Sequence, residues 1–196
     1  MRAVRRVVGR AVALDRADVD TDQIIPAHWL RRIERTGYGA GLFEAWRRDP
    51  SFPLNDPARA GASILIAGPN FGCGSSREHA AWALEDAGFR AIVAPSFADI
   101  FRQNCLAVGL VAAQVEADAA RALMRLTEGD PTTEVVVDVE ERVVRAPRIE
   151  APFPLDDFAQ WRLLNGLDDI ALTLRHREAI AAYEARRAAW LPRAEG

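Results

Sequence analysis

The sequence predicts an α/β fold built around a largely parallel sheet. From residue 62 onward, short aliphatic runs alternate with helical patterns. The chain has 196 residues, of which 49% are apolar, and this is enough to bury the core of one domain. We therefore expect a single domain over residues 1–196, with strands and helices alternating over 62–68, 75–87, 90–95, 97–107, 109–115 and 117–128.

The flanking segments have patterns of their own. Residues 4–14 are predicted to form a strand, and the acidic stretch 18–22 a turn. Residues 35–62 carry glycine, proline and aromatic side chains, which predicts a long ordered loop with at most short helical pieces. Two β-branched runs within 133–146 predict a hairpin, and 155–190 is predicted to contain two helices as a C-terminal helical extension.

Composition excludes several functional classes. The net charge of −3 gives no reason to expect nucleic acid as a partner. All 25 basic residues are arginine, which excludes Schiff-base lysines and the P-loop lysine. No apolar stretch reaches the length of a membrane span or a signal-peptide core, so we expect a cytoplasmic protein without membrane contact. Cys73 and Cys105 are too few to ligate an iron–sulfur cluster or a structural zinc, and no metal site is predicted.

A glycine-rich turn, Gly-Cys-Gly-Ser-Ser-Arg-Glu-His over residues 72–79, concentrates the polar chemistry of the chain. It follows the predicted strand 62–68 and enters the predicted helix 75–87. The hydroxyls of Ser75 and Ser76 and the guanidinium of Arg77 then lie at a helix N-terminus, where unpaired N–H groups attract anions. Because arginine binds carboxylates through two parallel N–H hydrogen bonds, the residues of this turn predict a carboxylate-binding site.

This turn also admits other interpretations. Dinucleotide, Walker and esterase motifs all fail, since Arg77 replaces the third glycine, lysine is absent and neither serine has the flanking glycines. The spacing of Ser75 and Glu78 also fits a capping box, and this alternative stays open.

Cys73 is better explained as a small packing residue than as a nucleophile. The acidic stretch 18–22 lacks the spacing of a calcium loop, so a turn with one carboxylate used in the site is favoured.

The chain resembles a known family at several places. Asp-Thr-Asp-Gln-Ile-Ile-Pro over 20–26, the loop 34–47, the turn 68–79, and the segments 96–104 and 166–174 are similar to the small subunit of 3-isopropylmalate dehydratase. That family is similar to the fourth, swivelling domain of aconitase. The resemblance implies a swivelling β/β/α domain and a hydro-lyase of leucine biosynthesis that interconverts 2-isopropylmalate and 3-isopropylmalate. It also implies a [4Fe–4S] cluster on a separate large subunit and none bound by this chain.

The resemblance implies roles for individual residues. Ser75 would be the base that removes a proton from the substrate, while Ser76 and Arg77 would bind substrate carboxylate. Asp22 would support the hydrogen bonds of the active site, and Arg35 is a candidate for a further arginine of the superfamily.

The loop 34–47 prompts a hypothesis on specificity. Its apolar side chains Tyr38, Leu42 and Phe43 could line a wall for the branched alkyl group of the substrate, or could simply pack within the loop. Two alternatives for function also stay open. The chain could serve a related hydro-lyase of the homoaconitate, methylmalate or citraconate type, or could be a non-catalytic module that binds dicarboxylates.

Overall fold

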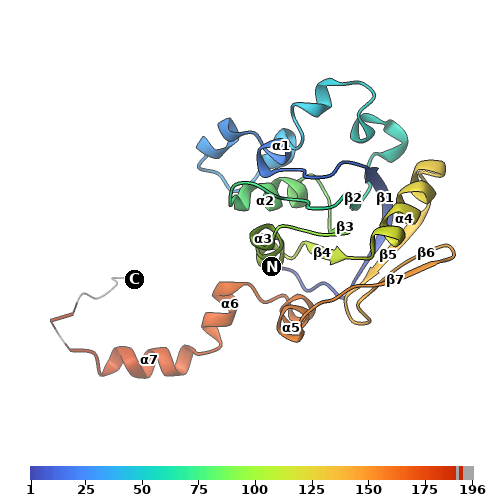
Figure 1. Cartoon of the computed structure of the whole chain (residues 1–196). Helices are drawn as coiled ribbons and strands as arrows, with labels where there is room; N and C mark the ends of the chain where they lie inside the picture. Colours follow the sequence, from blue (N-terminus) through green and yellow to red (C-terminus); the bar gives the residue numbers. More distant parts are fainter. Residues whose placement is uncertain (189, 192–196) are drawn as a thin grey trace.

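The computed structural model describes residues 1–188 and 190–191 and has an α/β fold (Figure 1). A seven-stranded sheet has the order β4-β3-β2-β1-β5-β6-β7. Strands β1 to β4 run parallel, whereas β5, β6 and β7 pair antiparallel beside β1. The strands are β1 (Arg6–Leu14), β2 (Ile64–Ala67), β3 (Ala91–Ala94), β4 (Val111–Gln114), β5 (Glu134–Asp138), β6 (Val143–Ala146) and β7 (Ile149–Pro152).

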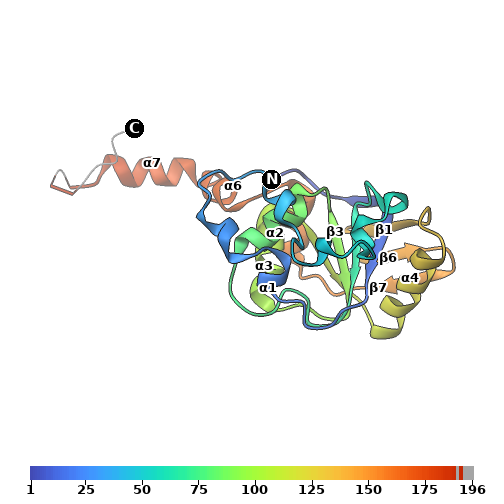
Figure 2. The same cartoon turned by 90° about the horizontal axis from the view of Figure 1, so that it is seen from above.

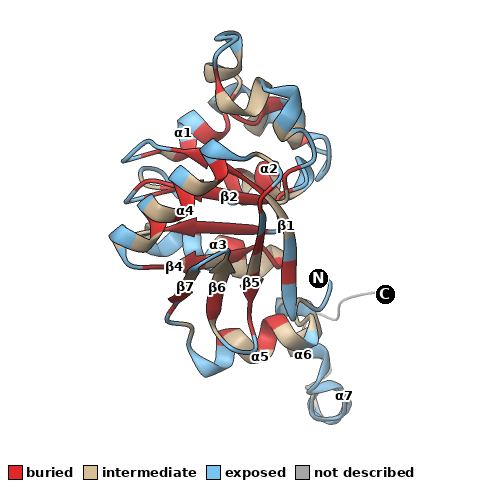
Figure 3. Cartoon of the chain, turned by 90° about the vertical axis from the view of Figure 1, so that its right-hand side faces the viewer, coloured by how far each residue is buried: buried red, intermediate tan, exposed pale blue. Residues whose placement is uncertain are grey.

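The parallel strands bury both faces, because successive side chains point to opposite sides. On one side, α2 (Glu78–Asp86), α3 (Asp99–Val108) and the long segment between β1 and β2 cover the sheet. On the other side, α4 (Ala117–Gly129) packs on β1, β2, β3 and β7. There Val111 of β4, Val144 of β6 and Ala151 of β7 share one apolar core, so the sheet curls around it (Figure 3).

The segment between β1 and β2 is ordered without long helices, which confirms the expectation for 35–62. It holds the one-turn helix α1 (Thr21–Ile24), which Asp20 and Gln23 cap reciprocally, and five 3₁₀ turns. Its aromatic side chains anchor it, with Phe43 stacked on Trp46 at 5.3 Å between ring centroids. The 3₁₀ turns are η1 (Ala27–Arg31), η2 (Tyr38–Gly41), η3 (Trp46–Arg48), η4 (Pro53–Asn55) and η5 (Pro57–Arg59).

One buried carboxylate links the two halves of the sheet. Asp138 at the end of β5 is 1% exposed and accepts hydrogen bonds from Arg6 Nη2 at 2.7 Å and from the backbone N–H of Glu141 at 3.0 Å. Burial tends to raise the pKa of Asp138, but these hydrogen bonds outweigh it and hold the pKa below its usual value.

The chain after α4 holds more elements than its pattern predicts. The expected hairpin within 133–146 is present as β5 and β6, but a third strand, β7, follows it. The two helices expected over 155–190 are three, namely α5 (Asp157–Asn165), α6 (Asp169–Leu174) and α7 (Arg177–Ala185), and residue 189 lies outside the described residues. Gly166, with φ of +66°, ends α5, and Asp168 caps α6.

The last helix projects from the body of the molecule. Figures 1 and 2 both show α7 extending away from the sheet and its covering helices. None of the helices in the described residues is long and apolar enough to cross a membrane.

Candidate active site

The predicted site lies at the carboxyl ends of three neighbouring parallel strands. The loops after β1, β2 and β3 meet there through backbone hydrogen bonds. The N–H of Gly72 donates to the carbonyl of Val19 at 2.7 Å, and the N–H of Thr21 donates to the carbonyl of Cys73 at 3.0 Å. The N–H of Ala98 donates to the carbonyl of Phe71 at 3.1 Å. In open α/β sheets ligands bind at this edge, so the topology favours a binding site here.

Two glycines allow the loop after β2 to approach its neighbours. Gly72 has a φ of +79°, and a Cβ atom there would lie 2.1 Å from Cγ of Phe101 on α3. Gly74 has a φ of +86°, and its Cβ would lie 3.3 Å from Cβ of Asp20. A side chain at Gly72 would therefore force the loop away from α3.

The helix after this loop begins later than predicted. It starts at Glu78, with Arg77 in an extended conformation at the N-cap position and no side-chain cap. Ser75 and Ser76 therefore precede the helix, and the capping box considered for Ser75 and Glu78 does not form. A capping box exists instead at Asp20 and Gln23, where Asp20 Oδ1 accepts from the N–H of Gln23 at 2.8 Å.

Arg77 is held beside the serines by an ion pair. Its Nη1 contacts Oδ1 of Asp22, which joins the loop after β2 to helix α1. The Arg77 side chain is 15% exposed, whereas that of Asp22 is 53% exposed. Arginine has five N–H donors, and within the described residues the others of Arg77 make no hydrogen bond. The guanidinium is thus oriented while keeping donors for a ligand.

The serines border a cavity of about 280 Å³. Both residues are exposed, and neither hydroxyl makes a hydrogen bond within the described part of the chain. The backbone carbonyl of Ser75 accepts from Oγ1 of the buried Thr21 at 2.8 Å, which fixes the loop beneath the hydroxyl. The structure therefore brings Ser75, Ser76 and Arg77 together at one cavity, with Asp22 attached through its ion pair.

Helix α3 supplies site residues that sequence reasoning missed. Ile100 is 51% exposed and Asn104 contributes a buried amide nitrogen without a hydrogen-bond partner in the described residues, and both line the cavity of the serines. The signal was available, since α3 follows β3 and parallel neighbours place their following loops at one edge.

The remaining predicted residues lie elsewhere. Tyr38 is 1% exposed and Leu42 is fully buried, so both pack in the core rather than at the cavity of the serines. This placement differs from the expected substrate wall and agrees with simple packing of the loop. The Tyr38 ring packs against His79 and Trp82, with distances between ring centroids of 5.3 and 5.7 Å. Arg35 is exposed, and its guanidinium lies 5.1 Å from the Trp82 ring.

Neither cysteine is an activated thiol. Burial, and then the charges of Asp20 and Asp18, raise the pKa of Cys73, which disfavours the nucleophilic thiolate. Complete burial raises the pKa of Cys105 strongly. The described residues contain no group of three or more metal-ligating side chains, so the residues present do not form a binding set for an iron–sulfur cluster.

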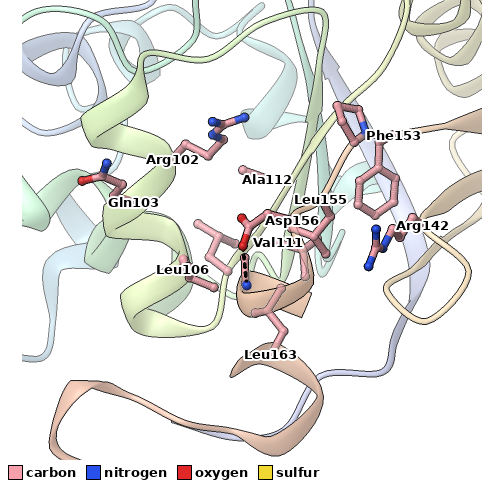
Figure 4. Close-up of a pocket in the computed structure, with 13 residues that line it drawn as sticks. Arg102, Gln103, Leu106, Val111, Ala112, Arg142, Phe153, Leu155, Asp156 and Leu163 are labelled. Atoms are coloured by element: carbon pink, nitrogen blue, oxygen red, sulfur yellow. Dashed lines mark hydrogen bonds between the residues drawn. The ribbon is translucent and has the colours of Figure 1, made fainter. Parts of the chain in front are cut away.

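A larger cavity, of about 620 Å³, borders α3 at Arg102, Gln103 and Leu106 and contains none of the predicted site residues (Figure 4). Its wall is mostly apolar, with Leu106 and Val111 facing Leu155 and Leu163. Asp156 at its edge is already engaged, since it accepts from the N–H of Ala159 at 2.8 Å.

Comparisons with known proteins match the fold of this chain. A family model described as the aconitase C-terminal domain matches residues 1–118, and one described as the C-terminal domain of the 3-isopropylmalate dehydratase small subunit matches residues 169–196. The fold and site therefore define an α/β domain of the aconitase C-terminal class.

Individual related proteins identify the family within this class. A 3-isopropylmalate dehydratase small subunit of Parafrankia sp. is 62% identical over 98% of each chain, and that of Streptomyces coelicolor is 55% identical over the same shares. The crystal structure of a 3-isopropylmalate dehydratase from Methanocaldococcus jannaschii has a TM-score of 0.65 and 28% identity, covering 91% of this chain and 99% of that one. The chain belongs to the family of 3-isopropylmalate dehydratase small subunits, and so to a hydro-lyase.

Proposed function

We propose that this chain supplies the base and the carboxylate-binding groups for the interconversion of 2-isopropylmalate and 3-isopropylmalate, a step of leucine biosynthesis in the cytoplasm. In this proposal a large subunit carries a [4Fe–4S] cluster, which supplies Lewis acidity when bound there. The observation that carries the proposal is the Ser75 hydroxyl, which has no hydrogen-bond partner among the described residues and lies beside an arginine already held by Asp22.

Ser75 acts on the substrate carbon next to the one that bears the hydroxyl. Its ionised oxygen takes a proton from that carbon, the C–H electron pair becomes the second bond of an alkene, and the C–O bond breaks to release hydroxide. In the rehydration, hydroxide adds to the carbon that lost the proton, and Ser75 returns the proton to the carbon that lost the hydroxyl. Ser76 and the unpaired N–H groups of Arg77 hold a substrate carboxylate during both half-reactions.

The ionised serine needs more stabilisation than its own helix gives. A helix N-terminus contributes about 0.3–1 kcal/mol to a nearby anion, and this effect falls off within one turn. Ser75 lies three residues before Glu78, where helix α2 begins, so the contribution is at the low end. The positive charge of Arg77 and the exclusion of water by the partner supply the rest.

Replacing the base in the reconstituted enzyme tests the proposal. We expect Ser75→Ala, mixed with the purified large subunit, to lose about 10²–10⁴-fold in kcat, the usual contribution of a positioned base. Ser51→Ala removes an exposed hydroxyl remote from the cavity and is the matched control. The isolated chain is expected to show no turnover. Wild-type rates for the Ser75 variant with full assembly would refute the proposal.

A further inference from the structure

The C-terminal arm, here α6, α7 and the residues up to 191 that the structure describes, exposes an unusual amount of apolar surface. Eight large apolar side chains are exposed in the described chain, and four of them lie in this arm. They are Ile170 (72% exposed), Leu174 (55%), Tyr183 (54%) and Trp190 (82%). Neither α6 nor α7 has a fully buried residue within the described part of the chain, so most of the surface of the arm is left uncovered.

Helices this short need a surface to pack against. Helix α7 has 9 residues and α6 has 6, while isolated helices shorter than about 12–15 residues are marginal in water. Ile170 and Leu174 are four residues apart and share one face of α6. Ile180 and Tyr183 are three apart and share one face of α7. Each helix thus presents an apolar stripe that is suited to a second surface.

The root of the arm is held firmly on the body. The N–H of Val4 donates to the carbonyl of Leu163 at 2.8 Å. Arg162 donates from Nε to the carbonyl of Leu167 at 3.0 Å and from Nη2 to Asp169 at 2.7 Å. The arm therefore leaves the body in a defined direction (Figures 1 and 2), which lowers the entropy lost when it docks.

We propose that this arm docks its apolar stripes on the large subunit and thereby holds the two chains together. The inference rests on the proposed function, because the partner is the same. The family model for the aconitase C-terminal domain ends at residue 118, whereas the model particular to dehydratase small subunits begins at 169, where α6 begins. The arm thus lies outside the match to the aconitase C-terminal domain and inside the match to the dehydratase small subunit.

A separate chain needs binding energy that a domain of a longer chain does not. A covalent linker gives a neighbouring domain an effective concentration on the order of mM, and a free subunit has to replace it by contact area. Buried aromatic side chains each contribute about 150–250 Å², so Tyr183 and Trp190 at their present exposures offer roughly 300 Å². This is a large share of the about 800 Å² per partner in a standard interface.

Two variants of the full chain test the docking. Ile170→Ser with Tyr183→Ser removes the stripes from exposed positions, and Val8→Ser removes an exposed apolar side chain of the body (48% exposed) as the matched control. Binding to the purified large subunit is measured by titration calorimetry. We expect the arm variant to raise Kd at least tenfold, and the control to stay within twofold of wild type. Hydrogen exchange should show new protection over 169–187 when the subunits are mixed.

Each outcome decides the inference. An unchanged Kd for the arm variant overturns it, and so does protection of 169–187 that rises with the concentration of this chain alone, since the occupant is then a second copy. The proposed function is tested separately by the Ser75 variant. That variant should bind the large subunit normally and lose turnover, whereas the arm variant should recover turnover at saturating large subunit.

Discussion

Replacing Gly72 with alanine tests the packing that builds the site. Two costs follow from the structure. A left-handed conformation costs a non-glycine residue roughly 1–2 kcal/mol, and overpacking a well-filled region costs about 1–3 kcal/mol more. The second cost applies because the new Cβ would lie 2.1 Å from Phe101 Cγ. We therefore expect Gly72→Ala to lower the free energy of unfolding by about 2–5 kcal/mol.

Gly88 provides the control for this experiment. It also has a positive φ, of +103°, but a Cβ there would meet nothing within 4 Å. Gly88→Ala should therefore cost only the backbone strain of about 1–2 kcal/mol. Urea unfolding of both variants, with unchanged m-values, measures the difference. Equal losses of unfolding free energy in the two variants would refute the close approach of the loop to α3. They would also remove steric crowding as the reason for glycine at residue 72.

Three further predictions concern titratable groups. Asp22→Asn breaks the ion pair between Arg77 and an exposed carboxylate, so the free energy of unfolding should change by less than about 1 kcal/mol. The KM of the reconstituted enzyme should rise. An unchanged KM would contradict the role of Asp22 in orienting Arg77. The raised pKa values and burial of the thiols predict that, at pH 8, Ellman's reagent labels Cys73 slowly and Cys105 only after unfolding; rapid labelling of both would contradict this. Because the pKa of Asp138 is lowered on folding, its stabilisation is present above the unfolded pKa of about 3.9 and is lost as the pH falls through the lower folded value. The difference in unfolding free energy between wild type and Asp138→Asn should therefore shrink below about pH 4, as denaturation at several pH values would show.

The regular part of the fold was predictable because its strands are buried on both faces. Runs such as 64–67 and 91–94 contain no polar residue and are separated by helical patterns of ordinary length. The α/β class, the order of elements from β2 to α4 and the irregular segment before β2 are confirmed. The strand β7 was missed because it buries only Ala151 and ends at Pro152, which is typical of an edge strand and gives a weak pattern.

The site was predictable in part. The motif placed Ser75, Ser76 and Arg77 together, and the structure shows that they border one cavity. It could not fix where α2 begins, because Ser75 and Glu78 fit a capping box as well as a loop. In the structure Arg77 is extended and the helix begins only at Glu78. The loop aromatics were the harder case, since an apolar side chain in a loop can face either the core or a ligand, and Tyr38 and Leu42 face the core.

The backbone bridges among the loops after β1, β2 and β3 have a consequence for how such enzymes diversify. In the proposed function, Ser75, Ser76 and Arg77 are therefore held in place by contacts within this polypeptide, independent of the partner's own chemistry. In the proposed two-chain enzyme, exchanging this subunit for that of a related hydro-lyase would exchange all of these site residues together. Chimeric pairs should then reveal which subunit dictates the choice of substrate.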